Sequence, residues 1–471
     1  MGETDGIWYN IRMSFFKAYD MRGTFGVDFD LDTVYRAGRG LPAVVRPRNE
    51  PSKAGSGAFR VLIGRDARTS SPAIAAALAA GLTEAGAEVV DLGPATTPMV
   101  YFFTAEEDFD ASVMVTASHN PPSDNGLKVS RRGALPVGRD SGLAELEGIV
   151  RADASRYDPS RAPVPRETTD PARLARYVAW LRAHGAFDPA RSLRFAVDCS
   201  DGMASILAHS LFGDGVVYLN DRPDGAFPHH SPNPLLAESR KQLAAAVRER
   251  GLDCGVIFDG DADRCMFVDE KGDFIQPDYL IPLLASTFGA PGTVIHDVRT
   301  SRAAIERLVA DGFKPVMGKV GHAFAKVLLR ETGAICGGEL AGHYYFRDFH
   351  FCDSGELAAL RILGAFADAK ERGLAVSAAL APVMGRYANS GEVNFKVSDT
   401  AAATSRVLAA AAGLACETGR SEMDGYRLEY AEGWISVRRS NTEPYLRLIV
   451  ECDTDERLRK WLDALSAAIR G

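Results

Sequence analysis

The chain repeats one order of apolar and polar segments: an apolar run ends in a polar turn, a helical stretch follows, and a second apolar run comes next. The pattern begins at Arg60 (RVLIGRDARTSSPAIAAALAAGLTEAGAEVVDLG), Arg194 (RFAVDCSDGMASILAHSLF) and Gly292 (GTVIHDVRTSRAAIERLVADGF). Strand, helix and strand in this order predict a parallel βαβ unit. In the first copy, Ser70 to Pro72 favour a helix start and Gly86 favours its end. We expect three related α/β domains, although unrelated parallel sheets show the same general order.

The last stretch of the chain has a different pattern. The segment YRLEYAEGWISVRRSNTEPYLRLIVECDTDERLRKWLDALSAAI reads as two apolar strands around a polar loop, followed by a closing helix, which predicts an α+β domain. Proline and charge clusters between Asp158 and Pro171 indicate the first linker. We therefore expect four domains, covering residues 1–167, 168–273, 274–384 and 385–471.

Length and charge restrict the class of protein. A chain of 471 residues is too long for one ordinary core and suggests about three to four domains. Its 54 lysines and arginines against 62 aspartates and glutamates give a net charge of −8, so no global basic field attracts nucleic acid or an anionic membrane. We expect local groups to hold any anionic ligand, with neither nucleic acid nor a membrane as partner.

The compartment is inferred from the ends, the apolar stretches and the cysteines. The segment MGETDGIWYNIRMSFF has early acids and no basic segment leading into an apolar stretch, so it does not indicate a secretory signal. The alanine-rich stretches 73–87 and 401–415 are interrupted by charges and fall short of a membrane span. The seven cysteines are scattered without a CxxC pair, which indicates neither disulfides nor a thiolate zinc site. We expect a cytoplasmic protein.

The first candidate site is TASHNP, residues 116–121, directly after the apolar run ASVMV. Ser118 stands in a turn at the carboxyl end of a predicted strand, the edge where open α/β sheets bind ligands. A serine becomes a nucleophile beside a base or a metal, and His119 and Lys128 are near in sequence. An ordinary serine-asparagine-proline turn remains an alternative. A serine hydrolase is disfavoured because Ser118 lacks the GxSxG setting.

The second candidate site is DGDADR, which places Asp259, Asp261 and Asp263 between two apolar runs. Three carboxylates at alternate positions can converge on one hard cation, which suits Mg²⁺ when a phosphate supplies further oxygens. An EF-hand calcium loop would also find acids here, but Arg264 occupies its glycine position and the flanks resemble strands. A guanidinium beside the metal fits a site that handles phosphate.

Two further polar loops could bind a sugar phosphate. The loop GGELAGH presents Glu339, which can accept bonds from two vicinal hydroxyls, and His343, which can bind phosphate or move protons. The loop RRSNTEP offers a guanidinium with hydroxyl, amide and backbone donors that would form an anion cradle, from Arg438, Ser440, Asn441 and Thr442. Taken alone, each of these segments could equally be an ordinary polar loop or hairpin with no binding function.

The order of these four motifs resembles the α-D-phosphohexomutase family, closest to phosphomannomutase/phosphoglucomutase. The resemblance runs from FKAYDMRG near the start to RRSNTEP near the end. It implies three related α/β domains with mixed sheets plus a C-terminal α+β domain around a central cleft. In chain order these would be a phosphoserine domain, a metal-binding domain, a sugar-recognition domain and a C-terminal phosphate-binding domain.

The resemblance also implies roles for individual residues. Ser118 would be the phosphoserine, and the ligands of one Mg²⁺ would be Ser118, Asp259, Asp261 and Asp263. The residues that would act on the transferring phosphoryl group or as general acids and bases are Arg22, His119, Lys128, Arg264 and His322. The residues that would bind the substrate are Tyr19, Arg299, Glu339, His343, Arg438, Ser440, Asn441 and Thr442.

The activity implied is interconversion of hexose 1-phosphate and hexose 6-phosphate, of mannose and/or glucose, through phosphoserine. A hexose 1,6-bisphosphate would be both intermediate and activator. Ala341 departs from the usual GEMSGH loop, and the loss of that serine hydroxyl leaves the preferred hexose open. The alternatives are a phosphoglucosamine mutase, a magnesium-dependent sugar phosphatase and a non-catalytic phosphosugar-binding protein. The sequence predicts neither an oligomeric state nor a pathway.

Overall fold

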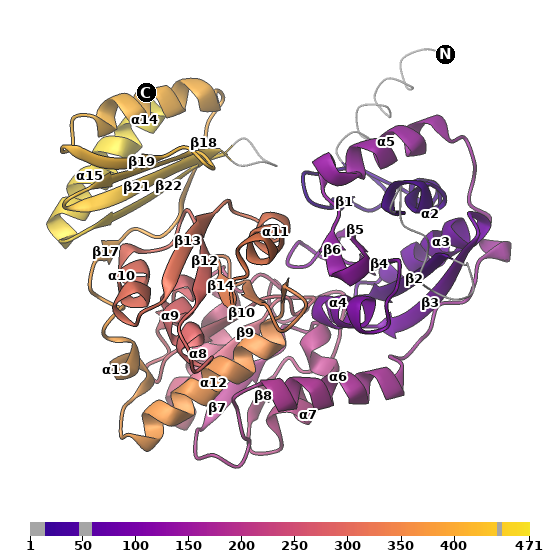
Figure 1. Ribbon diagram of the computed structural model, residues 1–471, viewed down its shortest axis with the longest axis horizontal. Helices are drawn as coiled ribbons and strands as arrows, with labels where there is room; N and C mark the ends of the chain where they lie inside the picture. The colour runs from indigo at the N-terminus through magenta and orange to yellow at the C-terminus, as the bar shows by residue number, and fades with distance from the viewer. Residues whose placement is uncertain (1–14, 47–58, 440–444) are drawn as a thin grey trace. The chain divides into compact units, whose positions relative to one another are not determined.

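The computed structural model describes residues 15–46, 59–439 and 445–471, and the chain divides into two compact units (elements labelled in Figure 1). Unit 1 comprises residues 1–275 and 341–376, whereas unit 2 comprises residues 276–340 and 377–471. The chain therefore leaves unit 1 and returns to it before ending in unit 2.

The first sheet of unit 1 mixes parallel and antiparallel strands. In spatial order its strands are β1 (Met21–Thr24), β5 (Asp124–Arg131), β4 (Ala111–Val115), β2 (Phe59–Arg65) and β3 (Ala87–Pro94), with β6 (Leu135–Pro136) paired to β5. Its helices are α2 (Leu31–Val45), α3 (Ser71–Glu84), α4 (Thr97–Glu106) and α5 (Leu143–Ala152). Strands β2 and β3 are parallel and α3 connects them, so the first predicted βαβ unit is confirmed. Gly86, the predicted helix stop, has a φ of 82°.

The second sheet of unit 1 carries the second repeat. In spatial order its strands are β11 (Phe274–Ile275), β10 (Cys265–Val268), β9 (Cys254–Phe258), β7 (Phe195–Asp198) and β8 (Val217–Leu219). Strand β7 runs parallel to β8 and β9, whereas β10 and β11 are antiparallel. The helices of this part are α6 (Pro171–His184), α7 (Ala208–Phe212), α8 (Lys241–Arg250) and α12 (Gly355–Glu371). A hairpin of β15 (Tyr344–Phe346) and β16 (Cys352–Asp353) also belongs to unit 1.

Unit 2 begins with the third repeat. Its parallel strands, in spatial order, are β13 (Lys314–Gly318), β12 (Thr293–Asp297) and β14 (Cys336–Gly338). The helices of this part are α9 (Ile281–Ser286), α10 (Arg302–Ala310) and α11 (His322–Thr332). Because the three strands are parallel, the loops after them meet at one edge of the sheet.

The C-terminal part of unit 2 is an antiparallel sheet with helices packed on it. In spatial order its strands are β17 (Ala388–Asn389), β22 (Tyr445–Cys452), β21 (Gly433–Arg439), β20 (Tyr426–Tyr430) and β19 (Glu417–Ser421), with β18 (Val393–Lys396) paired to β22. The helices are α13 (Val376–Leu380), α14 (Thr400–Ala411) and α15 (Asp455–Arg470). Alternate residues of β21 and β22, such as Ile435, Val437 and Leu448, share a core with Trp461 of α15.

The predicted fold class is confirmed by these sheets, with three α/β repeats and a C-terminal α+β part. The predicted domain boundaries, after residues 167, 273 and 384, stay predictions.

Helices α2 and α3 are in backbone contact through two glycines. A Cβ atom added at Gly81 would lie 2.1 Å from the carbonyl oxygen of Tyr35, and one added at Gly38 would lie 2.5 Å from that of Leu78. Backbone atoms cannot move aside as a flexible side chain can, so these positions require glycine. The contact fixes α3, and with it the end of the turn that joins β2 to α3.

We expect Gly81→Ala to lower the free energy of unfolding of unit 1 by about 1–3 kcal/mol, because the added methyl group must push the two helices apart. Gly148 of α5 provides the control, since a Cβ there would meet no atom within 4 Å. Gly148→Ala should be neutral or stabilising by up to about 1 kcal/mol, as alanine favours a helix interior. Denaturant unfolding of both variants checks this, and equal effects would contradict the contact.

Candidate functional site

Ser118 lies in the turn after β4, at the carboxyl edge of the first sheet. Its φ of 51° is uncommon for a residue with a side chain, and only 3% of its surface is exposed. Its hydroxyl donates to Asp259 Oδ2 at 2.7 Å and accepts from Arg264 Nη2 at 3.2 Å. The serine loop (residues 116–124) and the acidic loop (residues 259–264) therefore meet at this oxygen.

The acidic loop joins β9 to β10, and its three aspartates are fully buried. One carboxylate oxygen of each lies within 4.8 Å of those of the other two. Asp261 Oδ1 and Asp263 Oδ1 have no hydrogen-bond partner among the residues that the structure describes. A buried carboxylate oxygen without a partner is costly, and clustered carboxylate oxygens are what a hard divalent cation binds. The acidic loop therefore fits a metal site.

Two buried cations face the three aspartates. Lys128 Nζ lies 2.6 Å from Asp261 Oδ2 and 2.5 Å from Asp263 Oδ2. Arg264 Nε lies 2.9 Å from Asp259 Oδ2. Three negative charges thus face two positive charges in a region shielded from water, so one negative charge is left to be neutralised by a ligand.

The surplus charge changes the acidity of the cluster. Burial raises the pKa of Asp259 to about 7, with the charges of Asp263 and Asp261 adding to the rise and Arg264 opposing it. Burial also disfavours the charged form of Asp263, but Lys128 outweighs it and holds the pKa of that carboxyl below its usual range. A carboxyl with a pKa near neutrality beside ionised ones is the expected response of a cluster with one negative charge too many.

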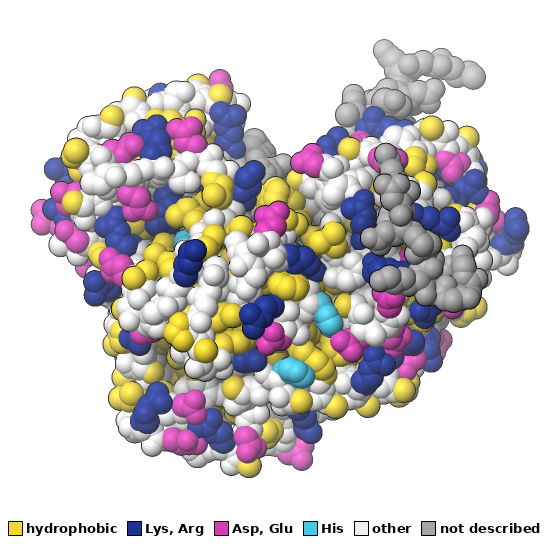
Figure 2. All heavy atoms as spheres, viewed as in Figure 1, with side chains coloured by type: hydrophobic (Ala, Val, Ile, Leu, Met, Phe, Trp, Pro, Cys, Tyr) yellow, Lys and Arg dark blue, Asp and Glu magenta, His cyan; other side chains and the backbone are white. Residues whose placement is uncertain are grey.

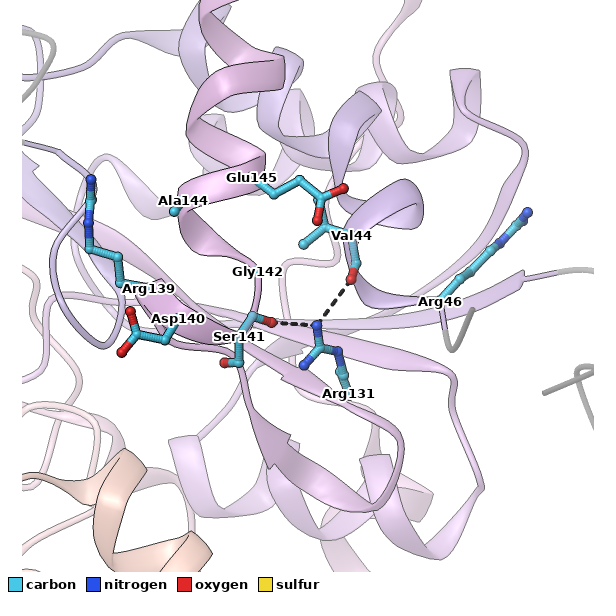
Figure 3. A pocket seen from close by; sticks show the side chains of 9 residues that line it. All are labelled: Val44, Arg46, Arg131, Arg139, Asp140, Ser141, Gly142, Ala144 and Glu145. Atoms are coloured by element: carbon cyan, nitrogen blue, oxygen red, sulfur yellow. Dashed lines mark hydrogen bonds between the residues drawn. The ribbon is translucent and has the colours of Figure 1, made fainter. Parts of the chain in front are cut away.

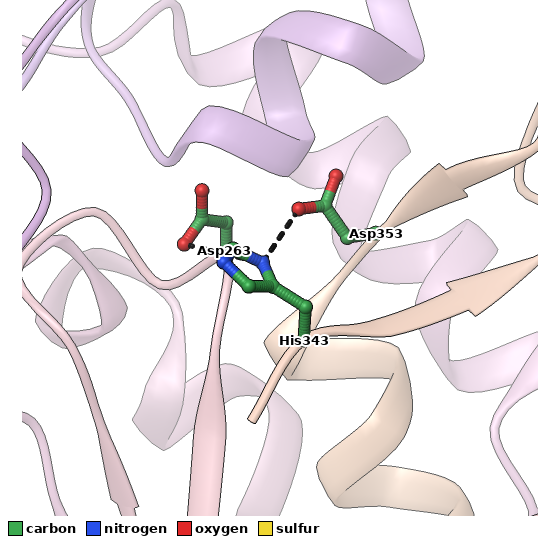
Figure 4. Close-up of side chains that lie close together, drawn as sticks. All are labelled: Asp263, His343 and Asp353. Carbon is green, nitrogen blue, oxygen red and sulfur yellow. Dashed lines mark hydrogen bonds and ion pairs between the residues drawn. The ribbon is translucent and has the colours of Figure 1, made fainter. Parts of the chain in front are cut away.

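His343 joins this cluster from the start of the β15–β16 hairpin. Its Nδ1 lies 2.8 Å from Asp353 Oδ2 and 3.9 Å from Asp263 Oδ1, and Figure 4 shows the imidazole with both carboxylates beside it. Burial lowers the pKa of His343, yet the two carboxylates outweigh burial and raise it overall. The sequence predicted His343 as a sugar-binding residue, and the structure places it against the predicted metal site.

The remaining predicted residues of unit 1 surround Ser118. His119 Nδ1 lies 3.4 Å from the Ser118 hydroxyl, and burial, followed by the positive charges around it, holds its pKa well below the usual range. Arg22, on β1, donates to the side chain of Asn120 at 3.1 Å and pairs with Asp20 at 2.6 Å. Tyr19 precedes β1 and is half-buried.

The predicted residues of unit 2 gather at the carboxyl edge of β12, β13 and β14. Arg299 follows β12 and pairs with Asp297 at 2.7 Å, and that carboxylate also accepts the backbone N–H of Leu340. Glu339 follows β14 and accepts the N–H of Gly321, the residue before His322 at the start of α11. Unit 2 therefore brings Arg299, Glu339 and His322 to one edge.

Arg438, near the end of β21, pairs with Asp424 at 2.9 Å. Asp424 also accepts the backbone N–H of Val320 at 2.9 Å, so the C-terminal sheet is tied to the loop before α11. Ser440, Asn441 and Thr442, predicted as the phosphate cradle with Arg438, lie outside the described residues.

Sequence reasoning missed three polar residues at these sites. Thr97 donates to Asp261 Oδ2 at 2.5 Å, Asp353 pairs with His343, and Asp424 links Arg438 to the loop before α11. None stands in one of the four motifs. Each acts on a partner that only the fold brings near, and the one available signal was Thr97 directly before a proline at a helix start.

One pocket of unit 1 is lined by none of the predicted site residues that the structure describes. It is lined by Val44, Arg46, Arg131, Arg139 to Gly142, Ala144 and Glu145 (Figure 3). Over the described part of the face in Figure 2, basic and acidic side chains are interspersed. Within the described ranges, every helix is too short or too polar to cross a bilayer.

Four family models together match nearly the whole chain. They are the phosphoglucomutase/phosphomannomutase α/β/α domain I at residues 13–156, domain II at 175–272, domain III at 276–387 and the C-terminal domain at 392–468. The match follows the order of the three repeats and the C-terminal sheet.

Individual relatives agree with the family models. A phosphomannomutase of Salmonella montevideo is 36% identical over 451 residues, which is 93% of this chain and 95% of the relative. A protein of Xanthomonas campestris pv. campestris named phosphohexose mutases is 37% identical over 450 residues, or 94% and 96% of the two chains. A phosphoglucomutase/phosphomannomutase family protein of Burkholderia thailandensis superposes with a TM-score of 0.81 at 31% identity, covering 97% of each chain. This chain belongs to the phosphoglucomutase/phosphomannomutase family and is a phosphohexomutase, an intramolecular phosphotransferase.

Proposed function

We propose that this phosphohexomutase interconverts hexose 1-phosphate and hexose 6-phosphate, of mannose and/or glucose, through a phosphorylated Ser118. Relatives named phosphomannomutase support mannose as one substrate. The observation that carries the proposal is the Ser118 hydroxyl, which lies 2.7 Å from Asp259 and 3.2 Å from Arg264, in a cluster where two carboxylate oxygens accept no hydrogen bond from any described residue.

One Mg²⁺ would be held by Asp259, Asp261, Asp263 and an oxygen of the phosphorylated serine, and it would supply positive charge to the transferring phosphoryl group. Asp261 Oδ1 and Asp263 Oδ1, which accept no hydrogen bond in the described part of the chain, support this ligand set. Lys128 contacts the same two aspartates, so it orients them and adds charge at the site.

The phosphoryl transfer exchanges one P–O bond for another. The oxygen of a sugar hydroxyl forms a bond to phosphorus while the bond from phosphorus to Ser118 Oγ breaks. The sugar hydroxyl loses its proton in this step, and the freed serine oxygen gains one. Arg264 directs an N–H at that serine oxygen, where negative charge develops as it leaves. Positioning and charge stabilisation of this kind are most of what phosphoryl transfer requires.

The second half of the reaction returns a phosphoryl group from the other end of the sugar. The 1,6-bisphosphate must turn end for end, so contacts with the sugar must tolerate both orientations. Glu339 would accept bonds from sugar hydroxyls, and the distal phosphate would be bound by Arg438, Ser440, Asn441 and Thr442. Arg299, His322 and Tyr19 would complete the substrate contacts, and free bisphosphate would serve as activator.

We expect Ser118→Ala to lose nearly all turnover and to gain no phosphoryl group from glucose 1,6-bisphosphate in intact-mass analysis. The control is Ser112→Ala, because Ser112 is a buried, hydrogen-bonded serine on the preceding strand β4. That variant should take up one phosphoryl group and turn over like the wild type. Turnover by the Ser118 variant would remove the phosphoserine from the mechanism.

We expect Asp261→Asn to lose the stabilisation that Mg²⁺ gives the wild type. A ligand at 100 times its Kd stabilises a fold by about 2.7 kcal/mol, and the variant should gain far less at the same concentration. Thermal unfolding with and without Mg²⁺ measures this. Asp269→Asn is the control, since Asp269 is buried after β10 and accepts the nearby backbone N–H groups of Lys271 and Asp273. Equal magnesium shifts in wild type and Asp261→Asn would exclude the acidic loop as the site.

The substrate is tested by incubating the protein with mannose 1-phosphate, glucose 1-phosphate or glucosamine 1-phosphate, with Mg²⁺ and a bisphosphate, against an EDTA control. Metal-dependent formation of mannose or glucose 6-phosphate is the expected result. Faster conversion of glucosamine 1-phosphate would identify a phosphoglucosamine mutase. Release of inorganic phosphate would indicate a phosphatase, and binding without conversion a phosphosugar-binding protein.

A further inference from the structure

We infer that Arg68 is a positioning residue for Ser118, which sets the backbone of the serine loop and thereby the direction of the nucleophile. The inference rests on the proposed role of Ser118 as phosphoryl carrier. Arg68 lies in the turn between β2 and α3, fifty positions before Ser118 in the sequence, and its side chain is fully buried.

Every N–H of the Arg68 guanidinium has an acceptor. Nε donates to Asp66 Oδ2 at 3.0 Å. The four terminal N–H groups donate to four backbone carbonyl oxygens of the serine loop, those of Ser118 at 2.9 Å, Asn120 at 2.7 Å, Pro121 at 2.5 Å and Asp124 at 2.9 Å. One rigid, planar group therefore holds the turn at four points, and only arginine offers five donors in this arrangement.

The same pair of residues holds the other side of Ser118. The backbone N–H of Ser118 donates to Thr116 Oγ1 at 2.8 Å, and the Thr116 hydroxyl donates to Asp66 Oδ2 at 2.7 Å. The N–H and the carbonyl of Ser118 are thus both tied to the Asp66–Arg68 pair. This matters because Ser118 has a positive φ, a conformation that persists only when the surroundings impose it.

A neighbouring segment packs against both the side chain of Arg68 and the backbone around it. The Phe227 ring lies 5.1 Å from the guanidinium carbon, and a Cβ at Gly225 would lie 2.2 Å from the carbonyl oxygen of Ala67. The acidic loop packs closely against the serine loop, since a Cβ at Gly260 would lie 2.6 Å from the Ser118 carbonyl oxygen. The Ser118 carbonyl group that accepts a hydrogen bond from Arg68 is therefore also in contact with the acidic loop.

Arg68→Lys tests this positioning role. Lysine keeps the charge but offers three donors from one nitrogen, so it cannot hold four carbonyls and the carboxylate together. Transfer of the phosphoryl group from glucose 1,6-bisphosphate to Ser118, followed by rapid quench and intact mass, should slow about 100-fold, as expected for a nucleophile displaced by about 1 Å. The KM for hexose 1-phosphate should change little while kcat falls. Partial loss of folded protein would give the same split, so the quench experiment decides: it lowers the amplitude of phosphorylation when protein is lost, and lowers the rate constant only when Ser118 is mispositioned.

The matched control is Arg131→Lys. Arg131 also donates to two backbone carbonyls, those of Val44 and Ser141, but it does so at the far end of β5 (Figure 3). This variant should phosphorylate Ser118 at the wild-type rate. If Arg131→Lys is slowed as much as Arg68→Lys, the effect is not specific to the serine loop and the inference is wrong.

Thr116→Val keeps the inference testable if Arg68→Lys does not fold. It preserves the shape of the side chain and removes the hydroxyl between the Ser118 N–H and Asp66. Slower phosphorylation with an unchanged KM supports the inference, and wild-type phosphorylation in this variant or in folded Arg68→Lys overturns it. If the wild type itself takes no phosphoryl group from the bisphosphate, the proposed function fails first, and the inference fails with it.

Discussion

The structure of the candidate site depends on an imbalance of buried charge. Asp259, Asp261 and Asp263 are fully buried, and among the described residues Lys128 and Arg264 form their short ion pairs, with His343 farther off, 3.9 Å from Asp263. Burying uncompensated charge is strongly unfavourable, so such a cluster persists where a ligand completes it. A divalent cation would neutralise the carboxylates, and a phosphoryl group would in turn be bound by that cation, Lys128 and Arg264. The excess of buried negative charge is thus the feature that suits the site to bind a cation together with a phosphoryl group.

The fold supplies this cluster from parts that are far apart in the chain. The serine loop follows β4 of one sheet and the acidic loop follows β9 of the next, and both lie at carboxyl ends of strands. The hairpin of β15 and β16 then adds His343 with Asp353 after the chain has passed through unit 2. Because the βαβ unit is repeated, each repeat has a sheet edge at the carboxyl ends of its strands where polar side chains can gather.

Most of the fold and the motif residues could be predicted because both are local properties. The strand, turn and helix order of the three repeats, the helix stop at Gly86, and the acidic spacing of DGDADR are each visible within about thirty residues. The supporting residues could not be predicted this way. Arg68, Asp353 and Asp424 act on backbone or side-chain groups brought near only by the sheet order and the hairpin. The preferred hexose could not be predicted either, because it also depends on groups that only the fold brings together.

The central claim is that the phosphoryl group passes from Ser118 to the sugar and not to water. The most direct measurement is to load the protein with a radiolabelled phosphoryl group, remove the donor, and add unlabelled mannose 1-phosphate with Mg²⁺ in a single turnover. We expect the label to leave Ser118 and to appear in a hexose bisphosphate and then in mannose 6-phosphate. Label recovered as inorganic phosphate, or retained on Ser118, would contradict it.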